Sequence, residues 1–230
     1  MELKICFISD THGYHEEIST ESLGTGDILI HAGDISDTGK QSQVHKFLKW
    51  FNSISEYKTK IMIAGNHDWL FQQQPELGKM MINSYKDVIY LQDSSTTVHG
   101  IKVYGSPWQP EFYNWAFNLP RDGNQLKSIW GKIPEDTDIL ITHGPPYMML
   151  DKINASSPEH LGCKLLMDRV LEVEPTVHAF GHIHGGYGET SFHKITFINC
   201  SQLSERYIVS NKPVKLILDT DTKEITYDVY

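Results

Sequence analysis

The chain has 230 residues, which suffices for one well-buried domain, and its 40% hydrophobic and 21% charged residues are typical of a globular protein. A formal net charge of −9 without any basic run argues against binding to a long polyanion such as duplex nucleic acid. No apolar run reaches the length of a membrane span, and no signal-peptide pattern opens the sequence. We therefore expect a single domain over residues 1–230, located in the cytoplasm and not in a membrane.

The three cysteines, Cys6, Cys163 and Cys200, lie in apolar stretches and lack the spacing of a metal site. Because their number is odd, they cannot all pair within the chain. We expect three buried free thiols, which fits a protein of a reducing compartment.

Three short apolar segments in the first third of the chain each end in a polar turn that contains a glycine: Leu3–Ser9, Asp27–His31 and Ile61–Ala64. Their length is that of buried strands. Gln43–Phe51 carries apolar residues at the i, i+3, i+4 and i+7 spacing of a helix. Strands joined by a crossover helix indicate βαβ units and a largely parallel sheet, so the predicted fold class is α/β.

The remaining sequence predicts further strands and two more helices. One helix is expected over Leu77–Ser84, and another starts with Ser157 as N-cap and Pro158 at the first helical position and runs to Val170. The expected strands are Val88–Leu91, Thr96–His99, Ile101–Tyr104, Asp138–Thr142, Thr176–Phe180, Lys194–Cys200, Val214–Asp219 and Glu224–Val229.

Gly105–Pro120 holds five aromatic residues and three prolines, a composition that suits neither a helix nor a central strand. We interpret it as a long ordered loop. Two roles remain open at this point, because long loops are often functional and because aromatic side chains also cover sheets as part of a core.

Five of the predicted strands end in turns that carry side chains able to bind a metal. These are Asp10 and His12, Asp34, Asn66 with His67, His143, and His182 with His184. The carboxyl ends of parallel strands lie along one edge of a sheet, so these side chains should converge there. The repetition predicts a metal site. Next to it, His67 can transfer a proton near neutral pH, and Asp68 can hold its imidazole in one tautomer.

The ligand set contains nitrogen and oxygen atoms but no thiolate, which favours Mn²⁺, Fe, Zn²⁺ or Ni²⁺ over Ca²⁺ or Mg²⁺. With His67 set aside for proton transfer, seven candidate ligands remain, which exceed what one ion can hold, whereas two ions about 3.5–4 Å apart with a shared carboxylate account for them. Such a pair keeps a net positive charge and attracts an anionic group. A phosphate ester is the natural substrate, since a hydroxide bridging the two metals can attack phosphorus while the ions stabilise the equatorial oxygens.

The ordered blocks resemble the calcineurin-like metallophosphoesterases over Ile5–Gly188. The blocks are Asp10-x-His12, Gly33-Asp34, Gly65-Asn66-His67-Asp68, Thr142-His143 and Gly181-His182-x-His184. The resemblance implies a four-layer α/β/β/α sandwich with a dimetal site on one edge. It also implies that Asp10, His12 and His184 hold one metal, that Asn66, His143 and His182 hold the other, and that Asp34 bridges them. His67 would contact phosphate and protonate the leaving oxygen without binding metal, oriented by Asp68.

A closer likeness is to the metallophosphoesterase-domain-containing (MPPED) group. It is carried by Ile63–His67, Tyr90–Ser94, the Tyr104–Pro120 loop, Thr142–Pro146 and Gly185–Gly188. This likeness implies a small phosphodiesterase that acts on nucleotides, cyclic ones included, with Mn²⁺ as the expected cofactor. The first histidine of the last metal block is present as His182, so full occupancy of the second metal is expected.

Aromatic side chains near the predicted site can stack on a nucleobase. The candidates are Trp108, Phe112, Trp115 and Tyr187, each of which can equally be part of the core. Two alternative functions also remain. One is a phosphomonoesterase or protein phosphatase, although 230 residues leave little room for a protein-binding groove. The other is a nucleotide-binding scaffold with weak catalysis, which would not need His67 together with Asp68. The sequence predicts no oligomeric state.

Overall fold

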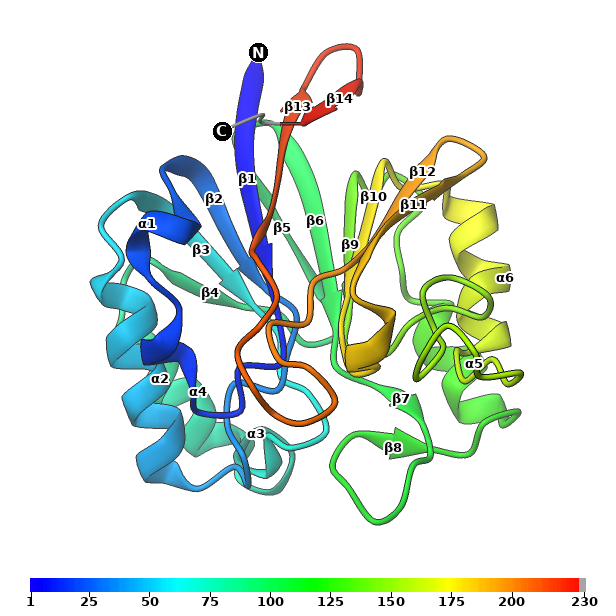
Figure 1. The fold of residues 1–230 in the computed structure, drawn as a ribbon, viewed down its shortest axis with the longest axis horizontal. Helices are drawn as coiled ribbons and strands as arrows, with labels where there is room; N and C mark the ends of the chain where they lie inside the picture. The colour runs from blue at the N-terminus through cyan, green and yellow to red at the C-terminus, as the bar shows by residue number, and fades with distance from the viewer. Residues whose placement is uncertain (228–230) are drawn as a thin grey trace.

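The computed structural model describes residues 1–227 and arranges them as two six-stranded sheets packed face to face, with helices on both outer faces (Figure 1). The strand orders are β14-β13-β1-β2-β3-β4 and β11-β12-β10-β9-β6-β5. This architecture confirms the predicted four-layer α/β/β/α sandwich.

The first sheet has a parallel half and an antiparallel half. Its strands are β1 (Glu2–Ile8), β2 (Gly26–His31), β3 (Tyr57–Met62), β4 (Val88–Tyr90), β13 (Val214–Asp219) and β14 (Ile225–Tyr227). β1 to β4 pair in parallel, whereas β13 pairs antiparallel with both β1 and β14. The strand predicted at Ile61–Ala64 begins earlier and ends at Met62. The last residues of the predicted Glu224–Val229 strand lie outside the described part of the chain.

The second sheet is parallel at its centre and antiparallel at both edges. Its strands are β5 (Ser94–Val98), β6 (Ile101–Ser106), β9 (Ile139–Thr142), β10 (Val177–Phe180), β11 (Gly188–Phe192) and β12 (Ile195–Asn199). The sequence did not predict β11, because this edge strand is exposed along most of its length and shows no apolar pattern. β7 (Gln109–Pro110) and β8 (Asn118–Leu119) pair within the aromatic loop, which otherwise stays irregular as predicted.

Helices cover the outer face of each sheet (Figure 1). The first sheet carries α1 (Thr20–Leu23), α2 (Gln41–Ser53), α3 (Trp69–Gln73) and α4 (Pro75–Asn83), and the second carries α5 (Asn124–Trp130) and α6 (Lys164–Val173). Two single turns, η1 (His15–Glu17) and η2 (His184–Gly186), complete the described helices. The sequence analysis did not predict α1, α3 or α5. No helix within residues 1–227 combines the length and hydropathy needed to cross a bilayer.

The helix predicted to start at Ser157 begins instead at Lys164, with Cys163 as its N-cap. The preceding segment folds around a buried carboxylate, Asp151. The backbone N–H of Leu161 donates to the Asp151 carbonyl, and the N–H of Gly162 donates to the Asp151 carboxylate. Because these amides are bound by Asp151, the Ser157 cap signal is overridden by tertiary contacts.

Three apolar layers hold the sandwich together. Side chains such as Phe7, Ile30 and Ile141 fill the space between the sheets, and Phe47 and Trp130 belong to the two outer layers beneath the helices. All three cysteines are buried and free, as predicted. In this packing, the parallel strands of both sheets end along one edge, where the turns that follow them meet.

His178 is a fully buried histidine in β10, in the outer layer of the second sheet. The Thr142 hydroxyl donates to the Gly144 carbonyl at 2.8 Å, so its oxygen accepts a hydrogen bond from His178 Nε2, also at 2.8 Å. The opposite nitrogen, Nδ1, has no partner among the described residues. Burial lowers the pKa of His178 from 6.5 to about 3, so the native state holds this ring neutral.

We expect His178 to contribute to acid destabilisation. The unfolded chain takes up a proton at this ring near pH 6.5 and the native chain does not, so stability is lost as the pH falls from 6.5 towards 3. Between pH 7 and pH 5 the protonation of this ring in the unfolded chain lowers the free energy of unfolding by about 2 kcal/mol. Urea unfolding at both pH values should show a correspondingly smaller loss in His178→Gln. An equal loss in both proteins would contradict the assignment.

Candidate metal centre

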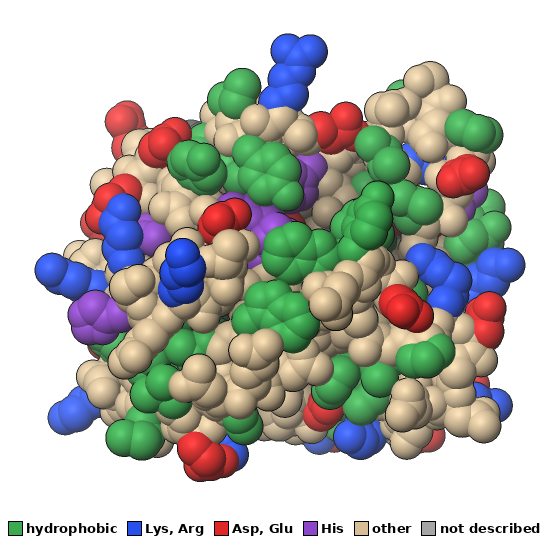
Figure 2. Space-filling model, turned by 90° about the horizontal axis from the view of Figure 1, so that it is seen from below, with side chains coloured by type: hydrophobic (Ala, Val, Ile, Leu, Met, Phe, Trp, Pro, Cys, Tyr) green, Lys and Arg blue, Asp and Glu red, His purple; other side chains and the backbone are tan. Residues whose placement is uncertain are grey.

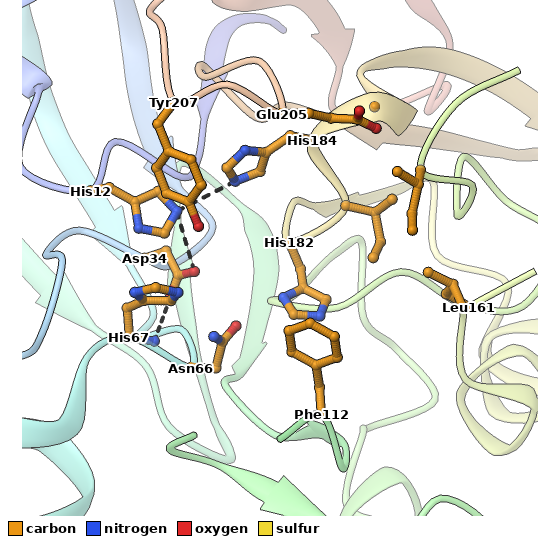
Figure 3. Close-up of a pocket in the computed structure, with 13 residues that line it drawn as sticks. His12, Asp34, Asn66, His67, Phe112, Leu161, His182, His184, Glu205 and Tyr207 are labelled. Carbon is orange, nitrogen blue, oxygen red and sulfur yellow. Dashed lines mark hydrogen bonds and ion pairs between the residues drawn. The ribbon is translucent and has the colours of Figure 1, made fainter. Parts of the chain in front are cut away.

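The seven predicted metal ligands and His67 come together where the parallel strands end. They lie in the turns after β1 (Asp10 and His12), β2 (Asp34), β3 (Asn66 and His67), β9 (His143) and β10 (His182 and His184). Six of them line one cavity of about 260 Å³ (Figure 3). The other two, Asp10 and His143, are fully buried against the lining residues. The predicted convergence of these residues is confirmed.

Four of these residues have a left-handed backbone conformation, which is unfavourable for most residues other than glycine. Their φ angles are 52° at Asp10, 43° at His12, 55° at Asp34 and 67° at His182. Such a conformation costs about 1–3 kcal/mol per residue and persists only where surrounding contacts impose it. Its repetition at four residues in three turns on one edge indicates that the contacts of the site hold these side chains in place against the preference of the backbone.

Two glycines let backbone segments approach the carboxylates. A Cβ atom on Gly65 would lie 2.3 Å from Asp34 Oδ1, and one on Gly181 would lie 1.9 Å from Asp10 Oδ2. No side chain fits at these distances. The glycines before Asn66 and His182 are therefore required by close packing around Asp34 and Asp10.

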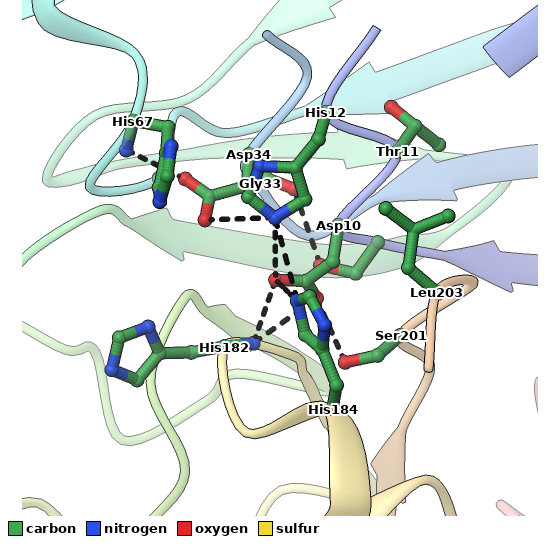
Figure 4. Close-up of polar contacts among 12 residues, drawn as sticks. Asp10, Thr11, His12, Gly33, Asp34, His67, His182, His184, Ser201 and Leu203 are labelled. Atoms are coloured by element: carbon green, nitrogen blue, oxygen red, sulfur yellow. Dashed lines mark hydrogen bonds and ion pairs between the residues drawn. The ribbon is translucent and has the colours of Figure 1, made fainter. Parts of the chain in front are cut away.

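Asp10, His12 and His184 form the first group of potential ligand atoms (Figure 4). His184 Nε2 lies 3.4 Å from Asp10 Oδ1 and 3.4 Å from His12 Nε2. His12 Nε2 lies 3.9 Å from the same Asp10 oxygen. Ligand atoms about 2.0–2.2 Å from a common cation are separated from one another by about 3–3.5 Å, so this group has the spacing of a metal site.

Asp34, His143 and His182 form the second group. His143 Nε2 lies 3.2 Å from Asp34 Oδ2 and 2.9 Å from the side-chain oxygen of Asn66. The same Asp34 oxygen lies 3.6 Å from His12 Nε2 in the first group. Asp34 thus stands between the two groups, where a single carboxylate can serve both.

Backbone carbonyls fix the tautomers of two of these imidazoles. His143 Nδ1 donates to the Ala32 carbonyl at 3.0 Å, and His184 Nδ1 donates to the Ser204 carbonyl at 3.1 Å. Since a carbonyl only accepts hydrogen bonds, the proton of each neutral ring is on Nδ1 and the lone pair is on Nε2. Both Nε2 atoms face the carboxylates, which is the arrangement that metal-binding histidines adopt. The donor set fits divalent cations.

The two carboxylates are buried, with 0% of Asp10 and 2% of Asp34 exposed. Burial alone would raise the pKa of each. For Asp10 the hydrogen bond and charge of His184 outweigh burial, and for Asp34 the charges of His143 and His67 do so, which leaves both pKa values below the ordinary range. Burial lowers the pKa of His143, but the Asp34 charge outweighs it and raises this pKa to about 9. The pocket thus attracts positive charge strongly, and cations there would displace these protons.

His67 lies beside the carboxylates on the β3 side of the cavity. Its backbone N–H donates to Asp34 Oδ1 at 2.8 Å, and its Nδ1 lies 2.6 Å from the Asp37 carbonyl, to which it donates. The indole of Trp115 stacks on the His67 ring, with centroids 4.0 Å apart and an interplanar angle of 22°. These contacts fix the ring, and Nε2 has no hydrogen-bond partner among the described residues. His67 also shares a third group of potential ligand atoms with His12 and Asp34.

The prediction that Asp68 orients His67 is wrong. The Asp68 carboxylate is fully buried and accepts hydrogen bonds from the N–H groups of Ile35, Ser36 and Gly65 and from the Ser36 hydroxyl. Burial, and then the charge of Asp34, raise its pKa to about 6. Asp68 therefore ties the turn after β2 to the turn after β3. The Asp37 carbonyl, and not Asp68, orients the His67 ring.

The four aromatic candidates occupy different places. Phe112 lines the cavity, with its ring centroid 5.6 Å from that of His182. Trp115 packs on His67 and does not line the cavity. Trp108 donates from Nε1 to Asp93 and packs against Phe117. Tyr187 donates to the Lys212 carbonyl and lines neighbouring cavities instead. Phe112 alone of the four lies in the position predicted for a substrate contact.

Sequence reasoning missed several residues of the cavity wall: Ile153, Leu161, Ile183, Glu205 and Tyr207. The Tyr207 ring lies 5.0 Å from His12 and 5.3 Å from His184, centroid to centroid, and its backbone has a φ of 58°. Ile183 lies within the last metal block, between His182 and His184, and Leu161 lies in the segment predicted as a helix, whereas Ile153, Glu205 and Tyr207 come from loops without periodicity or motif. Only the folded chain brings them to the site.

Comparison with known proteins agrees with this geometry. The family model described as calcineurin-like phosphoesterase matches residues 3–186. Metallophosphoesterase domain-containing protein 1 of Homo sapiens is 42% identical over 234 residues, covering 93% of this chain and 70% of that protein, and the protein of the same name from Mus musculus matches equally. Among solved structures, TT1561 of Thermus thermophilus shares the fold, with a TM-score of 0.67 and 14% identity over 99% of each chain. The family match spans most of the sequence and includes all the converging ligands. The chain belongs to the calcineurin-like phosphoesterase family.

Proposed function

We propose that this protein is a dinuclear-metal-dependent phosphodiesterase for small phosphoesters, nucleotides and cyclic nucleotides among them, with residues 1–227 acting as one catalytic domain. Family membership supports phosphoester hydrolysis. The observation that carries the finer proposal is the position of Asp34 Oδ2, which lies 3.2 Å from His143 Nε2 in one group of potential ligand atoms and 3.6 Å from His12 Nε2 in the other.

Each residue of the site has a distinct part in this proposal. Asp10, His12 and His184 would hold one metal, Asn66, His143 and His182 would hold the other, and Asp34 would serve both positions. Mn²⁺ suits this mixed nitrogen and oxygen set, with Fe, Zn²⁺ and Ni²⁺ as alternatives. When bound, the cations would supply positive charge for the phosphoryl oxygens and would lower the pKa of the attacking water.

His67 is proposed as the proton donor to the leaving oxygen. Its Nδ1 proton is committed to the Asp37 carbonyl, so the proton that it transfers must come from Nε2. Trp115 and the carbonyl together hold the ring at a fixed angle, which keeps Nε2 aimed at the cavity. A fixed donor transfers a proton without first losing rotamer freedom.

The charges of the wall favour a diester over a monoester. The lining residues include Glu205 but neither lysine nor arginine, and Phe112, Ile153 and Leu161 provide apolar surface. Only the metals could compensate the two negative charges of a monoester dianion. A diester carries one negative charge and a second organic group that the apolar wall can contact. The small cavity also disfavours a protein phosphatase.

Substrate preference tests the proposal. With Mn²⁺, we expect faster turnover of bis-p-nitrophenyl phosphate than of p-nitrophenyl phosphate, and loss of both activities on chelation. Nitrophenolate release is the readout. A faster monoester would favour a phosphomonoesterase, and tight nucleotide binding without turnover would favour a scaffold.

Asp34→Asn should remove most of the bound metal. The carboxylate serves both ion positions, and an amide in its place is a neutral, weaker ligand. Elemental analysis of metal-loaded protein should find about two ions per chain in the unmodified protein and at most one in the variant. Asp87→Asn, an exposed substitution outside the cavity, is the matched control. Normal metal content in Asp34→Asn would rule out a shared carboxylate.

His67→Ala should keep both metals and lose roughly 10²–10⁴ in turnover of esters with a basic leaving group. The loss should be much smaller with p-nitrophenolate, which leaves without needing a proton. His45→Ala, an exposed histidine on α2, is the control. Metal loss in His67→Ala would show that His67 is a ligand, and an equal loss with both leaving groups would exclude proton donation.

A further inference from the structure

A second cavity of about 330 Å³ shares Leu161 with the wall of the catalytic pocket. Three side chains that can carry positive charge line it, Arg121, His160 and Lys164, and none of them lines the catalytic pocket. The chain has 29 acidic and 20 basic residues, so such a group in one cavity departs from its overall charge. Figure 2 shows Lys and Arg side chains grouped at the right of the face that contains the histidines.

Arg121 is fixed by the loop that separates the two cavities. Its Nη1 donates to the carbonyls of Leu161 and Gly162, both at 3.0 Å. Its Nε and Nη2 donate to none of the residues that the structure describes, although Asp122 lines the same cavity. An exposed arginine usually samples many rotamers, whereas this guanidinium is held in place with donors to spare.

His160 is fixed by the carboxylate that organises the loop. Its Nδ1 lies 2.6 Å from Asp151 Oδ1, and Asp151 is only 1% exposed. The other Asp151 oxygen accepts from the N–H groups of Met148 and Gly162, at 2.9 and 3.0 Å. The Asp151–His160 contact therefore leaves the second ring nitrogen of His160 for a ligand in the cavity.

Lys164 is the first residue of α6, where its charge adds to the positive end of the helix dipole. A cation at this end costs stability unless an anion is close. Within residues 1–227 Lys164 forms no ion pair; its Nζ instead lies 5.0 Å from the centroid of the Tyr147 ring. That ring in turn contacts His160, with centroids 5.5 Å apart. The three basic groups are thus linked into one arrangement in which His160 pairs with Asp151, while Arg121 and Lys164 form no ion pair with any described residue.

We propose that this cavity binds a second phosphate of the substrate, so that the preferred substrates are phosphodiesters that also carry a terminal phosphate monoester. The inference rests on the proposed function, since the diester is cleaved in the neighbouring pocket and the terminal phosphate is only bound. A phosphate dianion offers several acceptor oxygens to the guanidinium, ammonium and imidazole donors. The lining of the catalytic pocket contains neither lysine nor arginine. A terminal phosphate therefore finds its basic partners in the second cavity, while the diester lies in the catalytic pocket.

Two substrate pairs test this with the metal-loaded protein. One pair is adenosine 2′,3′-cyclic phosphate with and without a 5′-phosphate, and the other is the p-nitrophenyl ester of thymidine 5′-phosphate with and without a 3′-phosphate. We expect about a 10-fold higher kcat/KM, through a lower KM, for the phosphorylated member of at least one pair. Absence of a preference in both pairs would overturn the proposal.

Variants assign the preference to the cavity. Lys164→Gln and Arg121→Gln should reduce the ratio of kcat/KM within the pair towards one, and Lys164 has no hydrogen bond to the loop whose loss could disturb folding. Asp122→Asn removes the nearby negative charge and should raise the ratio several-fold. Lys127→Gln on α5, outside the cavity, should leave it unchanged. A preference that persists in both Gln variants would also overturn the proposal.

A failure of the proposed phosphodiesterase activity can be distinguished from a failure of the proposed phosphate site. If the metal-loaded protein cleaves no diester of either pair, calorimetric titration with the same compounds still measures the cavity. Tighter binding of the phosphorylated member that is lost in Lys164→Gln would support the anion site without the enzyme activity. Equal affinity in the two proteins would refute it.

Discussion

Two carboxylates buried beside one another are the constraint on which the structure depends. Asp10 and Asp34 are almost inaccessible to solvent, yet both remain charged because imidazoles surround them. Two like charges in a buried site are costly unless positive charge compensates them, which divalent cations do more fully than protons. The left-handed turns, the glycines and the carbonyl-fixed imidazoles all serve to keep these two carboxylates close.

The sandwich meets this constraint by assembling the site from both sheets. Asp10, Asp34 and Asn66 follow strands of the first sheet, whereas His143 and His182 follow strands of the second. A parallel bridge between Ser9 and Ser201 joins the sheets at this edge, and the Ser201 hydroxyl donates to Asp10 Oδ2 at 2.8 Å. Neither sheet alone contains the site, so its geometry depends on packing of the apolar layer between the sheets.

Much of this was predictable from the sequence because the relevant signals are local. β1, β2, β9 and β10 lie within one residue of their predicted bounds, since continuous apolar runs mark strands buried on both faces. The convergence of the candidate ligands follows from the positions of the strand ends. The predictions that failed concern residues whose roles are set by tertiary contacts. Asp68 is two residues from Asn66 but binds the turn after β2, and the contacts of Asp151 override the helix start at Ser157. Tyr207 reaches the site from a loop that has no pattern.

The aromatic loop shows why core and functional roles need not exclude each other. Phe117 is fully buried and its N–H donates to the Gln72 side chain, while the neighbouring Ala116 N–H donates to the Asn66 carbonyl. One end of the loop is therefore part of the core and is bonded to the turn that carries a proposed ligand. Towards the other end, Trp115 packs on His67 and Phe112, 46% exposed, lines the cavity. Because the buried end is fixed, the exposed end can hold the His67 ring and part of the cavity wall in place without a helix or strand.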